Sequence, residues 1–204
     1  MTDITGLRLR RRLETAAEIE AAAFELFEQR GSEHTTVDDI AAAAGVSPRT
    51  FFRYFPTKEE AVLGVKHSFH DAVSGHIPSG AVAFGDLVHA TAEALAAFSA
   101  GDSAPLRRMM RFRCLCTKDD NLRQASLVVD AEQCRLRQQE VAAAGGSEAA
   151  LRARILVQTL SVALNAALDE WASRSTAGED TDLVEVFRAT CEMQRQMCGD
   201  AATA

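Results

Sequence analysis

The chain has few residues that interrupt helices and no pattern that builds strands. Four of its 204 residues are proline, and no alternating run of β-branched residues predicts a β-strand. No apolar run approaches the ~18–20 residues of a membrane span, and the basic N-terminus leads into a charged segment instead of an apolar signal core. The five cysteines are odd in number and lack the spacing of a disulfide framework. These absences predict a cytoplasmic, all-α protein whose cysteines are thiols.

Catalytic motifs are missing as well. The sequence contains no Gly-rich phosphate loop, no nucleophile motif and no convincing pair of carboxylates. Cys114 and Cys116 lie ~200° apart on a helix, so they do not readily share a metal ion. His67 and His70 have i, i+3 spacing beside Asp71, but a zinc site needs further ligands that the sequence does not identify. We therefore expect no enzyme activity, no cofactor and no metal.

Helix-forming residues fill the segments between the breaks in the chain. Ala, Leu, Glu, Gln and Arg dominate, and the prolines fall at helix boundaries. About nine helices are predicted, at residues 9–30, 37–44, 48–55, 58–75, 82–100, 104–116, 119–143, 147–173 and 180–198. We expect a three-helix N-terminal unit over residues 1–55, with the helix at 58–75 as a connector. Residues 56–204 are expected to form a larger helical domain.

The net charge of −7 argues against a nucleic-acid partner, but positive charge is concentrated in two patches. The first patch, within residues 1–12, comprises Arg8, Arg10, Arg11 and Arg12. It predicts either a contact with DNA phosphates or a minor groove, or a disordered solubilising tail. The second patch, residues 47–58, holds three basic residues and no acidic one.

The segment before the second patch has the signals of two short helices joined by a tight turn. Thr36 is a candidate N-cap, and Asp39 follows three residues later, where its carboxylate can bond an open amide. Gly45 provides the turn. Ser47 and Pro48 then restart the chain as N-cap and first helical residue. This arrangement predicts a helix-turn-helix.

The helix predicted at 48–55 has two chemically different faces. At ~100° per residue, one face gathers aromatic rings that we expect to wedge into the core: Phe51, Phe52 and Phe55. The other face gathers guanidinium groups suited to guanine edges and hydroxyls suited to phosphates: Arg49, Thr50, Arg53 and Tyr54. Lys58 follows in a capping box whose open amides favour a phosphate. The alternative is a core helix whose polar face is merely solvated.

The combination resembles the TetR family of transcriptional regulators. The motif is Ile19-x-x-Ala22-Ala23-x-x-Leu26-Phe27-x-x-x-Gly31, then Thr35-Thr36-Val37-x-x-Ile40-Ala41-x-x-Ala44-Gly45-Val46-Ser47, then Thr50-Phe51-x-x-Tyr54-Phe55-x-x-Lys58-Glu59. The resemblance implies dimeric binding to palindromic operators, with phosphate contacts from Thr50, Tyr54 and Lys58. Arg49 stands where the family often has glycine, and Phe52 where it often has tyrosine. Phe52 is therefore not expected to bind phosphate, while Arg49 adds a contact.

The residues expected to touch DNA are Thr36, Ser47, Arg49, Thr50, Arg53, Tyr54 and Lys58. The larger domain is expected to supply the dimer interface, because residues 155–168 form a helix that is apolar nearly all round. Such a helix is buried on both sides, by the core and by a second subunit. A wholly intrachain core is the alternative.

Large, soft side chains in the larger domain are candidates for an effector cavity, with an ordinary core as the alternative. They are Phe69, Phe98, Met109, Phe112, Leu115 and Trp171. Arg113 is added because arginines at 107, 108, 111 and 113 crowd beside this apolar stripe. The expected effector is an apolar molecule or an anionic one such as an acyl-coenzyme A. Pairing of these arginines with Asp119 and Asp120 is the alternative, and the C-terminal half is also similar to the mycofactocin-type branch of the family.

These patterns together predict a ligand-responsive, sequence-specific transcriptional regulator without a membrane partner. We expect a repressor that a small-molecule effector releases from its operator. Three alternatives stay open: a helical module that binds an acidic protein, a DNA-binding protein without sequence preference, and a helical enzyme.

Overall fold

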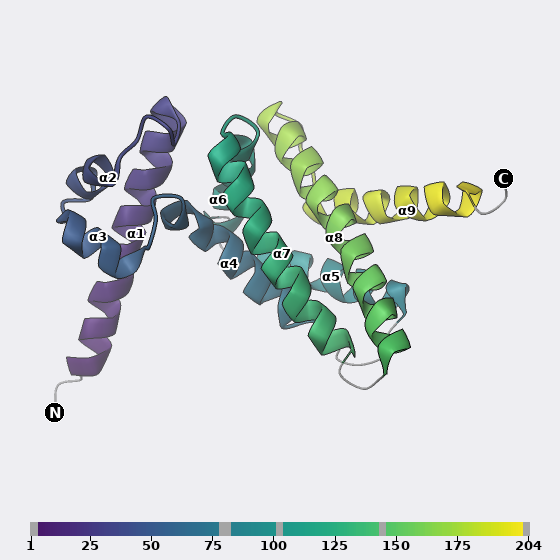
Figure 1. Ribbon diagram of the computed structural model, residues 1–204. Coiled ribbons are helices and arrows are strands. Elements are labelled where there is room, and N and C mark those ends of the chain that lie inside the picture. Colours follow the sequence, from purple (N-terminus) through teal and green to yellow (C-terminus); the bar gives the residue numbers. More distant parts are fainter. Residues whose placement is uncertain (1–3, 78–82, 101–103, 143–145, 202–204) are drawn as a thin grey trace. The chain divides into compact units, whose positions relative to one another are not determined.

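The computed structural model describes residues 4–77, 83–100, 104–142 and 146–201, and these residues form nine helices and no strand (Figure 1). The helices are α1 (Ile4–Arg30), α2 (Val37–Ala43), α3 (Pro48–Tyr54), α4 (Glu60–Ser74), α5 (Phe84–Ser99), α6 (Ala104–Cys116), α7 (Asp120–Ala142), α8 (Ser147–Thr176) and α9 (Leu183–Ala201). The predicted all-α class is confirmed, and each predicted helix overlaps one of these nine. The largest difference is at α1, which was predicted to begin at residue 9 and begins at Ile4. The added segment is rich in Arg and Leu, which favour helices.

The chain divides into two compact units, which are described separately. The N-terminal unit comprises Met1–Val65 together with Leu115–Ser126, and the C-terminal unit comprises Lys66–Cys114 together with Leu127–Ala204. This division differs from the boundary expected at residue 55. Helix α4 contributes residues to both units, and the segment around the α6–α7 turn packs with the N-terminal helices.

The first three helices contribute a compact set of side chains to the core of the N-terminal unit. Helix α2 packs against α1 and α3, and the inward side chains of all three are fully or almost fully buried. They include Ile19, Ala23, Phe27, Ile40 and Phe51. Burial of a large apolar side chain stabilises a fold by about 1.5–3 kcal/mol, so these few contacts supply much of the energy that holds α3 in place.

Two buried or half-buried charged residues tie the loop between α1 and α2. Asp119 accepts hydrogen bonds from the Ser32 amide (2.7 Å) and from the Ser32 hydroxyl (2.8 Å), although 87 residues separate them. It also caps α7 through the Leu122 amide at 3.0 Å. The Lys58 ammonium donates to the backbone carbonyls of Ser32 and Thr35. The loop is therefore held by one carboxylate and one ammonium.

The C-terminal unit is built around α8. Helix α8 packs against α9 and α5, and α5 packs against α9. One face of α8 is buried, whereas Leu151, Ile155 and Val162 on the same helix are exposed within the chain. By length and composition alone, α8 also passes as a membrane span, but a core helix of a helical protein passes that test too. The buried face identifies it as a core helix in this fold.

Candidate nucleic-acid interface

The turn between α2 and α3 has the backbone geometry that the sequence predicted. Gly45 has φ +67°, a conformation that strains residues with a Cβ atom. The Ser47 hydroxyl accepts a hydrogen bond from the Thr50 amide at 3.1 Å and caps α3, and Pro48 occupies the first turn. The Ser47 and Thr50 hydroxyls lie 3.0 Å apart. These bonds fix the start of α3, and both hydroxyls remain at an accessible or partly accessible surface.

The cap of α2 is a closed set of hydrogen bonds. The Thr36 hydroxyl donates to Asp39 at 2.7 Å and accepts from the Asp39 amide at 3.2 Å, and the Thr36 amide donates to the same carboxylate at 2.9 Å. Arg30 adds an ion pair of 2.8 Å. The bonds from Thr36, more than the charge of Arg30, lower the pKa of Asp39 to about 2. Thr36 is one of the predicted DNA contacts, but its hydroxyl proton is used for capping. Only a lone pair on the hydroxyl oxygen is left, and it can accept a hydrogen bond from a ligand but not donate one.

The exposed face of α3 differs from the predicted one at a single residue. Phe51 is fully buried, but Phe52 is 57% exposed and Phe55 is half-buried, so the prediction that all three wedge into the core was wrong for Phe52. Phe52 instead shares the outer face with Arg49 and Arg53, which are both exposed.

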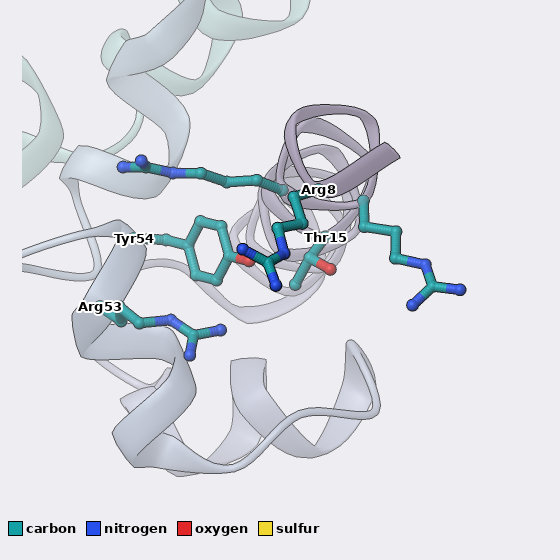
Figure 2. A pocket seen from close by; sticks show the side chains of 6 residues that line it. Arg8, Thr15, Arg53 and Tyr54 are labelled. Atoms are coloured by element: carbon teal, nitrogen blue, oxygen red, sulfur yellow. The ribbon is translucent and has the colours of Figure 1, made fainter. Parts of the chain in front are cut away.

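Helix α1 contributes a second group of cations. The arginines at positions 8 to 12 belong to a helix, and the expectation of a disordered tail is not met from Ile4 onward. An open hollow of about 550 Å³ is lined by Arg8, Arg11, Arg12 and Thr15 of α1 and by Arg53 and Tyr54 of α3. In Figure 2, Arg53 and Tyr54 extend from α3 toward the face of α1 that carries Arg8 and Thr15.

The hollow has a simple electrostatic character. Four guanidinium groups line it together with two hydroxyls, and none of the lining residues is acidic. The Arg53 guanidinium also lies 5.3 Å from the centre of the Tyr54 ring, a cation–π distance that orients both side chains. Guanidinium and hydroxyl donors without local carboxylates match the oxygen acceptors of a phosphate backbone.

The remaining predicted DNA contact, Lys58, has another role in this structure. Its ammonium bonds two backbone carbonyls, one of them Thr35 at 3.0 Å, and lies 3.9 Å from the Glu59 carboxylate. Two of its three donors are therefore used inside the protein. With these two bonds Lys58 holds the α1–α2 loop, and the phosphate contact expected of it stays a prediction.

The predicted effector residues are distributed over both units of the chain. Phe69, Met109, Phe112 and Trp171 are buried in the C-terminal unit, and Phe69 stacks edge-on against Phe98 at 5.3 Å between ring centres. Leu115 falls in the N-terminal unit. None of the seven residues is among those that line the cavity around His70, Asp130 and Arg137. Their role in binding an effector stays a prediction.

Arg113 is also committed to structure. Its Nε donates to Asp169 at 2.8 Å, and its terminal nitrogens donate to the side-chain and backbone oxygens of Asn165 at 3.0 and 3.1 Å. A guanidinium with these partners has little capacity for an anionic head group. Asp119 and Asp120, the expected partners of these arginines, bind Ser32 and Arg123 (2.7 Å) respectively.

Sequence reasoning missed two contributors to this surface. Arg8, Arg11, Arg12 and Thr15 have the spacing of one helical face, which would have grouped them if the helix had been started before residue 9. Phe52 was placed inward because aromatic rings favour burial. Its flanking arginines, at positions 49 and 53, lie on the same helical face and were the available signal for the opposite orientation.

The N-terminal segment matches known regulatory proteins. Residues 19–64 match the model of the bacterial regulatory proteins of the tetR family. The chain is 52% identical over 58 residues to the HTH-type transcriptional regulator TcmR of Streptomyces glaucescens, covering 28% of this chain and 26% of that protein. It is 46% identical over 55 residues to MftR of Mycobacterium tuberculosis, a protein named for transcriptional regulation of mycofactocin biosynthesis, covering 27% and 28%.

Most of the chain aligns with the fold of a solved structure. A protein of Pseudomonas aeruginosa PAO1, described as a transcriptional regulator, aligns with a TM-score of 0.52 at 19% identity, over 92% of this chain and 91% of that one. The alignments with the curated relatives span only about a quarter of their length. The similarity of the C-terminal half to mycofactocin-type regulators therefore stays a prediction.

Proposed function

We propose that this chain, which carries the DNA-binding domain of the TetR family, is a cytoplasmic, ligand-responsive transcriptional regulator. As a homodimer it binds a palindromic operator and represses, and it has no enzyme activity. The observation that carries the proposal is the outer face of α3 beside the arginine-lined hollow. A folded helix-turn-helix there presents base-reading and phosphate-binding groups on adjacent surfaces.

Two sets of residues divide the work of recognition. Arg49, Phe52 and Arg53 lie on the outer face of α3, where guanidinium groups suit guanine and an aromatic ring suits the methyl group of thymine. The arginines of α1 line the hollow and bind phosphates, which sets register and orientation. The hydroxyls of Ser47, Thr50 and Tyr54 add phosphate contacts at the edge of α3.

The decisive test separates sequence discrimination from general affinity. Fluorescence anisotropy is measured with a duplex from the region upstream of the gene and with a shuffled duplex of the same composition. Arg49→Ala with Arg53→Ala should remove most of the difference between the two duplexes, because each bidentate base contact contributes about 1–3 kcal/mol of discrimination. Arg135→Ala with Arg174→Ala is the control, since both arginines are exposed and paired in the C-terminal unit.

The outcomes differ between the rival functions. Equal affinity of the unchanged protein for both duplexes would identify a DNA-binding protein without sequence preference. Lack of binding to either duplex at low salt would remove the DNA-binding proposal altogether. A loss of discrimination in the control variant, equal to that of the α3 variant, would contradict the assignment to α3.

The dimer is proposed to form through α8 and α9. Exposed apolar side chains recur on one face of α8, at Leu151, Ile155 and Val162, and on α9, at Met193 and Met197. Exposed apolar side chains gathered in this way mark a surface that binds another protein, and a two-fold interface uses the same surface on both subunits. Sedimentation velocity should give a dimer at micromolar concentration, and Val162→Glu should give a monomer. A monomer before the substitution would refute this part of the proposal.

A further inference from the structure

The C-terminal unit encloses a group of charged side chains that the DNA-binding function does not use. Lys66 is 3% exposed, His70 8% and Arg137 6%. The Lys66 ammonium donates to Asp130 at 2.6 Å, and the His70 Nε2 lies 3.1 Å from the other oxygen of the same carboxylate. Asp130 thus neutralises Lys66, and its hydrogen bond fixes the orientation of the imidazole ring.

Arg137 has no such partner. Its guanidinium donates to the Ser74 hydroxyl at 3.1 Å and forms no ion pair with any described carboxylate. Burial lowers its pKa, and only Cys134 and the exposed Glu140 act in the opposite direction. A buried cation without a counterion destabilises a fold, and five donors in a planar fork suit a carboxylate. The position of Arg137 therefore calls for an anion.

His70 adds an unused acceptor. Since Nε2 faces a carboxylate, the ring proton of the neutral form belongs on Nε2, and Nδ1 carries a lone pair. Nδ1 is buried and has no hydrogen-bond partner among the described residues. Burial, more than the neighbouring Lys66 and Arg137, lowers the pKa of His70 and outweighs Asp130, which favours this neutral form. A ligand group that donates a hydrogen bond would give His70 Nδ1 a partner.

Both residues line the same cavity. Most of the residues that line it have polar side chains, although their apolar atoms also face the cavity; they are His70, Asp130, Gln133, Cys134, Arg137, Ser161, Leu164 and Asn165. The Cys134 and Ser161 side chains bond each other at 2.9 Å, and Asn165 is held by Arg113, whereas Gln133 is half-buried without a described partner. The space for the centre of a water molecule is about 20 Å³, room for one water. A ligand larger than water needs additional room here, and the half-buried Gln133 side chain is the lining group best able to move and provide it.

We propose that this cavity binds a small organic carboxylate carrying a hydroxyl group, with the carboxylate on Arg137 and the hydroxyl donating to His70 Nδ1. This inference rests on the proposed regulatory function, in which the molecule is the effector. It replaces the apolar or acyl-coenzyme A ligand expected from the sequence. The buried Arg137 guanidinium and the unpartnered His70 Nδ1, not the aromatic core, indicate the chemical class.

The test uses the full chain and lactate as the probe, with acetate and propane-1,2-diol as matched compounds, all at constant ionic strength. Lactate should raise the melting temperature saturably, by roughly 3–5 °C at ten times its dissociation constant. Acetate lacks the hydroxyl and should raise it less, and the neutral diol should not raise it. Arg137→Gln should abolish the lactate shift, and His70→Phe should reduce it to that of acetate. Circular dichroism confirms that both variants are folded.

The control variant is Arg135→Gln, two residues away on α7, whose guanidinium is exposed and paired with Glu132 at 2.6 Å. It should leave the lactate shift unchanged. Equal shifts from lactate and the diol, or an unchanged lactate shift in Arg137→Gln, would overturn the site. The absence of any saturable shift in the unchanged protein would show a cavity that holds only water and would also overturn it.

A separate readout isolates the regulatory step. Anisotropy with the upstream duplex is repeated with and without saturating lactate. Saturable lactate binding without a change in DNA affinity would uphold the site and contradict its role as an effector site. Saturable lactate binding by a chain that does not bind DNA at all would uphold the site and contradict the proposed function.

Discussion

The two units treat their arginines in opposite ways. In the N-terminal unit, Arg8, Arg11, Arg12 and Arg53 surround a hollow without an acidic residue in its lining. In the C-terminal unit, four arginines are paired with carboxylates: Arg113 with Asp169, Arg135 with Glu132, Arg174 with Glu170 and Arg195 with Glu192. An exposed cation is solvated by water, so the four guanidinium groups around the hollow destabilise the fold only slightly, and together they attract a polyanion. Arg137 differs from all of these because it is buried and forms no ion pair with a described carboxylate, and a buried cation without a counterion destabilises a fold far more than an exposed one.

The largest predicted effect tests whether folding and recognition are separate within α3. Phe51→Ala should destabilise the protein by about 3–5 kcal/mol, because it removes a fully buried ring. Phe52→Ala, one residue later, should change stability by less than about 0.5 kcal/mol and should weaken discrimination of the operator. Urea unfolding and anisotropy measure the two effects. Similar losses of stability in both variants would place Phe52 in the core after all.

The next effect concerns the carboxylate that holds the α1–α2 loop. Asp119→Ala should lower the free energy of unfolding by about 2–4 kcal/mol, because the Ser32 and Leu122 amides lose their buried acceptor. Asp120→Ala is the matched control, since Asp120 is exposed. Denaturant unfolding of both variants decides whether the N-terminal unit depends on this distant residue.

The Asp119 carboxylate should also make the stability of the protein depend on pH. Burial acts to raise the pKa of Asp119, but the bonds from Ser32 and Leu122 outweigh it and lower the pKa below 3.8. The sign follows from linkage: a lowered folded-state pKa gives stability that is complete above 3.8 and is lost as the pH falls toward the lowered value. Asp119→Asn should therefore flatten the acid limb of the stability profile. An unchanged acid limb would contradict this assignment.

A smaller effect is expected at Lys58. Lys58→Met should destabilise the protein by about 1.5–3 kcal/mol, since two backbone carbonyls lose a charged donor. The slope of log affinity against log salt should stay unchanged if the ammonium contacts no phosphate. Lys118→Met, at an exposed position, is the control for charge. A slope lowered by about 0.9 in the Lys58 variant alone would restore the phosphate contact predicted from the sequence.

The smallest stability change, with a clear binding change, is expected for the hollow. Arg8→Ala with Arg11→Ala should leave the melting temperature unchanged and should make the salt slope shallower by about 1.8, because two phosphate contacts are lost. Arg174→Ala with Arg195→Ala should change stability by at most about 1 kcal/mol and leave the slope unchanged. Salt titrations of both double variants measure this contrast. If both double variants had the same salt slope, the proposed difference between the arginines of the hollow and the paired arginines of the C-terminal unit would be contradicted.

Local signals in the sequence were sufficient for the helices and the caps. The capping roles of Thr36 and Ser47 and the turn at Gly45 depend on residues at most four positions apart, and the structure shows all three. The orientation of α3 was less accessible. Periodicity gives the angles between side chains, but the arc that meets the core depends on how much room the neighbouring helices leave, and Phe52 was misplaced for that reason.

Charged residues were predicted least well, because their partners are distant in the sequence. Lys58 bonds residues 23 and 26 positions away, and Arg113 bonds residues more than 50 positions away. No pattern in the sequence near Lys58 or Arg113 indicates these partners. The DNA contacts themselves stay predictions, and the cavity beside Arg137 had no signal in the sequence that separates it from an ordinary polar helix face.

The bond between Ser32 and Asp119 has a consequence for how the protein is made. Synthesis on the ribosome delivers the helix-turn-helix first, yet its loop lacks an acceptor until residue 119 has left the exit tunnel. Early in translation, therefore, the nascent N-terminal segment is incomplete, and folding must wait for a contact of long sequence separation, which slows folding in general. A ribosome-stalled chain ending shortly after α3 should be cut readily by protease, whereas one stalled well past Ser126 should resist.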